Sequence, residues 1–124
     1  MPATLRIEER VPLGPLTTMG VGGPARFFTR ATSADQLSNA LRFARARDLP
    51  VFVLGGGSNL VVADRGIEAV VVRVEIDGFE IERTSEGAAT ARIGAGVLWD
   101  AVVERAVAEG LAGIECLSGI PGST

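Results

Sequence analysis

The sequence contains no His, no Tyr and no Lys, so all twelve of its basic residues are Arg. These absences exclude the most common general base, the lysine of the Walker phosphate-binding loop, Schiff-base chemistry and the Ser-His-Asp triad. Proton transfer by this chain would depend on a carboxylate, a hydroxyl or the single thiol. We therefore expect an enzyme of this composition to take its reactivity from an organic cofactor.

Cysteine is nearly absent as well, because Cys116 is the only one in the chain. A single cysteine excludes an intrachain disulfide framework and a metal site with several cysteine ligands, and we predict no metal site. Free cysteine is among the most buried residue types, so we expect Cys116 to be a reduced thiol in the core.

Long apolar runs are missing too. The longest ones are strand-length pieces such as residues 69–72, far below the roughly 18 residues that a membrane span needs. The first ten residues include acidic side chains and no long apolar segment, unlike a signal peptide. These features predict a cytoplasmic protein with no membrane partner.

Charge is unevenly distributed along the chain. Residues 1–50 carry seven Arg and four acids, whereas residues 51–124 carry five Arg and eleven acids, which gives the net charge of −3. The basic cluster of Arg42, Arg45 and Arg47 falls in the last turns of an expected helix, where cations complement the helix macrodipole. Because the total charge is acidic, we predict no nucleic-acid partner.

The 124 residues suffice for one compact domain, and the pattern of the chain is mixed. Ser-Ala-Asp-Gln at 33–36 is a capping-box pattern that predicts a helix closed by Pro50, and residues 99–109 predict a second helix that stops at Gly110. Strands are expected at 51–54, 69–74 and 90–93. Asp77-Gly78 is typical of a hairpin turn before residues 79–82. The fold class is therefore α+β.

Three glycine-rich segments are candidates for phosphate binding. Residues 20–25 fit G-x-G-x-x-A, but no strand precedes them and Pro24 occupies the expected helix start, which argues against a Rossmann fingerprint. Residues 94–99 place Trp99 where a small residue is needed, and we interpret them as a tight strand-to-helix turn.

Gly-Gly-Gly-Ser-Asn at 55–59 is the strongest candidate, because it follows an apolar strand and offers backbone N–H groups that no Cβ obstructs. These groups, with the Ser58 hydroxyl and the Asn59 amide, can surround a diphosphate. The three glycines are then explained by close approach of a ligand. A flexible hairpin loop is the alternative.

Four motifs in order resemble the N-terminal part of the UDP-N-acetylenolpyruvoylglucosamine reductase (UDP-N-acetylmuramate dehydrogenase) family: residues 17–26, 54–62, 94–99 and 110–115 with 119–122. The resemblance implies an FAD-binding domain of the vanillyl-alcohol-oxidase/PCMH type, with the first subdomain and the start of the second. It divides the chain into an N-terminal segment, 1–16, and an incomplete FAD-binding domain, 17–124.

In that family NADPH reduces the flavin, which then passes hydride to the enolpyruvyl double bond of a UDP-sugar in peptidoglycan precursor synthesis. The family's catalytic Arg, Ser and Glu lie in its later parts, including a substrate domain, so the resemblance assigns no catalytic residue here. It implies that this chain is a fragment, inactive alone, whose partners are FAD, the UDP-sugar and the missing C-terminal part.

The resemblance implies two cofactor-binding segments, and the Gly20 to Arg26 motif lies near the same site. The predicted cofactor-binding residues are Leu54, Gly55, Gly56, Gly57, Ser58, Asn59, Leu60, Gly119, Ile120, Pro121, Gly122, Ser123 and Thr124.

Other interpretations stay open on the sequence alone. The chain could belong to another FAD-dependent oxidoreductase of the same superfamily, or form a non-catalytic nucleotide-binding module. We expect Trp99 in the core rather than on a flavin, and a turn at residues 64–66. Glu115 fits a solvated role, a capping role or a site carboxylate. Arg26, Arg65 or solvent would balance a diphosphate's charge.

Overall fold

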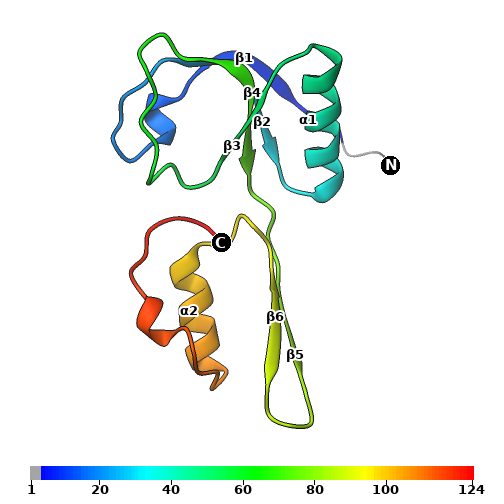
Figure 1. Cartoon of the computed structure of the whole chain (residues 1–124), viewed down its shortest axis with the longest axis vertical. Coiled ribbons are helices and arrows are strands. Elements are labelled where there is room, and N and C mark those ends of the chain that lie inside the picture. Colours follow the sequence, from blue (N-terminus) through cyan, green and yellow to red (C-terminus); the bar gives the residue numbers. More distant parts are fainter. Residues whose placement is uncertain (1–3) are drawn as a thin grey trace.

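The computed structural model describes residues 4–124, which form two lobes joined at a narrow junction (Figure 1). The first lobe contains β1 (Ile7–Pro12), η1 (Gly14–Leu16), β2 (Pro24–Ala31), α1 (Ala34–Ala46), β3 (Val51–Leu54) and β4 (Ile67–Val74). The second lobe contains β5 (Phe79–Arg83), β6 (Ala89–Ile93), α2 (Trp99–Ala108) and η2 (Glu115–Leu117). The mixed architecture confirms the predicted α+β class.

The sheet of the first lobe has the strand order β1-β2-β4-β3. β1 runs antiparallel to β2, whereas β2 and β3 are both parallel to β4. Ala31 pairs with Val74 and Leu54 pairs with Arg73, so the three parallel strands end level with one another. Their carboxyl ends face the junction with the second lobe (Figure 1).

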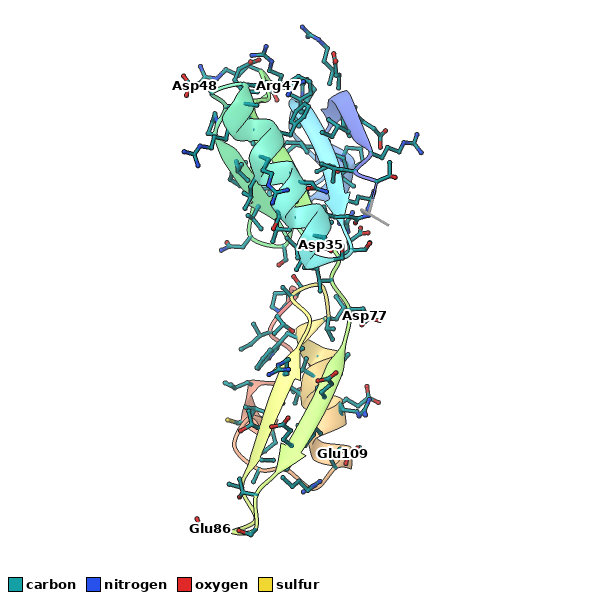
Figure 2. All side chains as sticks on the ribbon, turned by 90° about the vertical axis from the view of Figure 1, so that its right-hand side faces the viewer. Asp35, Arg47, Asp48, Asp77, Glu86 and Glu109 are labelled. Carbon is teal, nitrogen blue, oxygen red and sulfur yellow. The ribbon has the colours of Figure 1, made fainter. Side chains whose placement is uncertain are left out.

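The two faces of this sheet carry separate apolar clusters. On one face Ala40 and Ala44 of α1 pack with Val70 and Val72 of β4, and α1 covers this face in Figure 2. On the other face the loops around Leu13 and Val62 pack against β2, β3 and β4. Residues 69–72 are buried on both faces, as expected for a central parallel strand.

The predicted capping box at the start of α1 is confirmed with one change of partner. The Ser33 hydroxyl accepts a hydrogen bond from the Gln36 N–H at 3.2 Å, as an N-cap should. The Gln36 side-chain oxygen accepts from the N–H of Thr32, not of Ser33, at 2.8 Å. The reciprocal contact therefore begins one residue earlier than in the standard motif.

The arginines near the end of α1 have structural partners. The Arg47 guanidinium lies 3.6 Å from the centroid of the Phe43 ring and donates to the Phe43 carbonyl. Arg42 donates to the Asn39 side chain. Arg45 lies in the last turn of α1 and Arg47 is its C-cap residue, so the cluster lies at the helix end as predicted. Among residues 4–124, no helix is long and apolar enough to cross a membrane.

The hairpin prediction at Asp77-Gly78 was wrong. β5 pairs with β6 through a turn in which the Thr84 N–H donates to the Ala88 carbonyl, and β5 does not pair with β4. Asp77 instead lies at the junction between the lobes (Figure 2). The Gly94 N–H donates to the Gly78 carbonyl at 2.8 Å, next to the Phe79–Ile93 pair, so this bond extends the β5–β6 pairing by one step.

The second lobe is a two-stranded hairpin with one helix. Its buried side chains within the described part are Val102, Val103 and Ala106 of α2. Gly110 has φ +72° after the helix end, which confirms the predicted stop. The expectation of a buried Cys116 was wrong: the thiol is exposed, because η2 is a single surface turn outside this small core.

Candidate functional site

The two segments predicted to bind the cofactor meet at one hollow of about 270 Å³ between the lobes. One wall follows β3 at the carboxyl edge of the parallel strands, where ligands of α/β sheets commonly bind. Gly119, Ile120 and Thr124 were predicted but do not line the hollow, and Phe52 and Val53 line it without having been predicted. The predicted residues that line it are Leu54, Gly55, Gly56, Gly57, Ser58, Asn59, Leu60, Pro121, Gly122 and Ser123.

Each of the three consecutive glycines lies close to a different part of the chain. Gly57 is buried with φ +74°, and a Cβ there would overlap the Leu16 carbonyl oxygen. A Cβ on Gly55 would lie 2.8 Å from the Ser123 hydroxyl oxygen, and one on Gly56 only 3.5 Å from the Gly122 Cα. Position 57 thus requires glycine because the backbone at Leu16 lies against it. Gly56 is exposed and faces the hollow.

The donors around the hollow suit a diphosphate. Within residues 4–124, the N–H groups of Gly56, Gly57 and Ser58 donate to no protein acceptor. The hydroxyls of Ser58 and Ser123 lie on opposite walls. Consecutive free N–H groups form an anion-binding concavity without a charged side chain, so the site fits the diphosphate of FAD.

No arginine of the described chain lines this hollow. Arg26 and Arg65 line a different cavity of about 420 Å³ on the first lobe, where Arg26 pairs with Glu68 at 3.3 Å. The two arginines that were predicted as candidates to balance the charge of a diphosphate therefore lie away from the hollow. Within residues 4–124, backbone dipoles and solvent remain to balance that charge.

The second wall is held along the start of α2. The Trp99 N–H donates to the Gly122 carbonyl at 3.0 Å, and Leu98 forms a bridge with Ser123. The half-buried Trp99 ring donates its indole N–H to the Leu117 carbonyl at 2.9 Å. Trp99 is thus a support for this segment rather than the core residue expected.

The other glycine motifs support the site without lining it. Pro24 begins β2 instead of a helix, which confirms that residues 20–25 are not a Rossmann fingerprint. The loop before them contacts the glycine loop, because the Thr18 N–H donates to the Gly57 carbonyl at 3.0 Å. Residues 94–97 form the predicted tight turn, with Val97 N–H donating to the Gly94 carbonyl.

Glu115 and residues 64–66 have local roles. The pKa of Glu115 is lowered because its carboxylate accepts hydrogen bonds from its own N–H and from the Gly113 N–H at 2.6 Å. Glu115 is exposed and does not line the hollow, and η2 has no side-chain cap, so the carboxylate has a local, solvated role. The Gly66 N–H donates to the Ala63 carbonyl, which confirms the predicted turn.

An α+β domain that sets a glycine loop at the carboxyl ends of parallel strands, opposite a second glycine-rich segment, belongs to the class of dinucleotide-diphosphate-binding domains. The protein family described as "FAD binding domain" matches residues 25–124. The chain belongs to this family of FAD-binding domains. Its fold is accordingly the α+β FAD-binding domain of the vanillyl-alcohol-oxidase/PCMH type; the division at residues 1–16 and 17–124 stays a prediction.

Several curated relatives carry the name UDP-N-acetylenolpyruvoylglucosamine reductase. The protein from Thermobifida fusca is 43% identical over 119 residues, covering 96% of this chain and 33% of the relative. The one from Mycolicibacterium smegmatis is 47% identical over 121 residues, covering 98% and 32%. The chain thus spans about a third of the length of these relatives.

A solved structure agrees with these relatives. The crystal structure of UDP-N-acetylenolpyruvylglucosamine reductase from Thermus caldophilus is similar, with a TM-score of 0.71 and 34% identity. The similarity covers 97% of this chain and 40% of that one. The resemblance predicted from the four motifs is confirmed.

Proposed function

We propose that this chain forms the diphosphate-binding part of an FAD-dependent reductase that converts UDP-N-acetylglucosamine-enolpyruvate to UDP-N-acetylmuramate. NADPH is the proposed reductant, and the setting is the cytoplasmic synthesis of peptidoglycan precursors. One observation carries the proposal: the glycine loop and residues 121–123 meet in a single hollow. The names of relatives that are 43 and 47% identical support the substrate.

The role of the chain's own residues is to bind and orient the cofactor. The N–H groups of residues 56–58 and the Ser58 and Ser123 hydroxyls would hold the diphosphate. The hollow of about 270 Å³ is slightly smaller than ordinary ligand pockets, which begin near roughly 300 Å³. It therefore suits one part of FAD, with the remainder extending past it. When bound, FAD supplies hydride transfer.

FAD titration of the purified chain, followed by flavin fluorescence, tests the cofactor site. Gly56→Glu places a carboxylate in the hollow at a position where a Cβ meets only an ordinary contact, and we expect FAD affinity to fall at least about tenfold. Ser85→Glu adds the same charge in the exposed hairpin turn and should bind FAD as the unmodified chain does. Equal binding by the Gly56→Glu variant would place the diphosphate elsewhere.

The substrate step is tested separately. The family's catalytic Arg, Ser and Glu are assigned to parts beyond these residues, so we expect the 124 residues to bind FAD without reducing the UDP-sugar. The assay follows NADPH oxidation with and without UDP-N-acetylglucosamine-enolpyruvate at saturating FAD. Substrate-dependent NADPH oxidation by the 124 residues would contradict this division of roles.

A further inference from the structure

Asp100 makes side-chain contacts that its place in α2 does not require. An acidic residue in the first helical turn is favourable beside the helix macrodipole, wherever its carboxylate points. The Asp100 Oδ1 atom instead accepts hydrogen bonds from the Ser118 hydroxyl at 3.1 Å and the Gly119 N–H at 2.8 Å. The carboxylate thus ties a segment eighteen residues away to the helix start.

These bonds fix the start of the wall that faces the glycine loop. Gly119 has φ +84°, so the chain turns sharply at the residue that Asp100 holds. Three residues later, the Gly122 carbonyl accepts from the Trp99 N–H at 3.0 Å. Asp100 and Trp99, which are neighbours in α2, therefore hold the two ends of the Gly119 to Gly122 turn.

The wall has little freedom to shift without changing the hollow. A Cβ on Gly56 would lie 3.5 Å from the Gly122 Cα, and one on Gly122 would lie 3.3 Å from the Ser58 hydroxyl oxygen. The gap between the two loops is thus about the width of one methyl group, and a displacement of about one ångström is enough to misplace ligand-binding groups.

We propose that Asp100 is a positioning residue for cofactor binding: it holds the turn at Ser118 and Gly119 and so sets the separation between the glycine loop and Gly122. Asp100 does not line the hollow and acts through this segment. The inference rests on the proposed function, because it takes the hollow to hold the FAD diphosphate. The essential property is the acceptor oxygen, since both contacts use one atom.

Paired variants separate the acceptor from the charge. Asp100→Ala removes the acceptor of both hydrogen bonds, and we expect FAD affinity to fall about tenfold or more, the scale of two lost hydrogen bonds. Asp100→Asn keeps Oδ1 without the charge and should bind FAD within about threefold of the unmodified chain. Glu104→Ala removes an exposed acid one turn further along α2 and should leave the affinity unchanged.

The FAD titrations are run below the lowest unfolding temperature of the set, with Gly119 amide hydrogen exchange measured without FAD. We expect Gly119 exchange to be faster in Asp100→Ala and near the unmodified rate in Asp100→Asn. Unmodified FAD affinity in Asp100→Ala, equal loss in both variants, or unchanged Gly119 exchange would overturn the positioning role. A different result would overturn the proposed function: the unmodified chain binds no FAD, although Gly119 exchange is faster in Asp100→Ala. The contact would then hold the turn without any role in cofactor binding.

Discussion

Gly56 and Gly57 are adjacent in the loop, but the fold constrains only one of them. Gly57→Ala would force a side chain into the left-handed backbone region and against the Leu16 carbonyl. We expect a loss of about 2–4 kcal/mol in the free energy of unfolding. Gly56→Ala meets only an ordinary contact with Gly122 and should cost less than about 1 kcal/mol. Urea denaturation measures both, and equal losses would contradict this assignment.

Glu115 gives a prediction about pH. Its folded pKa lies below the ordinary value of 4.5, owing first to its own N–H and then to the Gly113 N–H. Since the folded pKa is depressed, the contact stabilises the turn above the unfolded pKa and is lost as pH falls through the folded pKa. The pKa of Glu115 can be measured from the pH dependence of its carboxyl ¹³C shift by NMR. A midpoint at or above 4.5 would contradict the contact.

At the scale of elements, the junction between lobes depends on two glycines. A Cβ on Gly96 would lie 2.5 Å from the Glu75 carbonyl carbon, and one on Gly94 would overlap the Ile76 carbonyl oxygen. Gly96→Ala should therefore cost about 2 kcal/mol or more, measured by thermal unfolding. Ala95→Ser, at the exposed residue between them, is the control and should be nearly neutral. A neutral Gly96→Ala would show that the junction readily adjusts.

Elements whose determinants are local were predictable from the sequence. The Ser33 cap gave the start of α1 to the residue, and the apolar run after Pro50 gave the bounds of β3. The glycine loop could be predicted as a candidate phosphate-binding site because three consecutive glycines are visible in the sequence. The resemblance then added residues 121–123, which spacing alone did not single out.

Features set by distant pairing could not be predicted. Asp77-Gly78 has hairpin chemistry, but Gly94 and Gly96, some twenty residues away, determine its surroundings. The acidic character of Asp100 was visible, yet its contacts with Ser118 and Gly119 follow from the tertiary fold. The prediction for Cys116 relied on the general tendency of cysteine to be buried. The residue is exposed because it lies in η2, a single turn at the surface.

For the whole molecule, the lobes should differ in stability. The first lobe has an apolar cluster on each sheet face. In the second lobe only Val102, Val103 and Ala106 are buried within the described part, and the hairpin and α2 together line a hollow of about 550 Å³. Amides of β5 and β6 should therefore exchange through a local opening of lower free energy than amides of β4. Native-state hydrogen exchange measures this difference.

A core variant distinguishes local opening from global unfolding. Val71 is fully buried in β4, and Val71→Ala should cost about 2 kcal/mol. It should lower the protection of β4 by that amount and leave β5 and β6 unchanged. An equal fall in both lobes would show a single cooperative unit.

The strand order β1-β2-β4-β3 also bears on how the chain emerges during synthesis. β2 lies beside β4, from which it is separated by α1 and β3, and Ala31 pairs with Val74. Such pairing closes a long loop, so the first sheet can close only after Val74 has left the ribosome. From that moment every strand of this sheet is available. The glycine loop can thus be in place before its facing wall is translated, and residues 121–123 complete the hollow last.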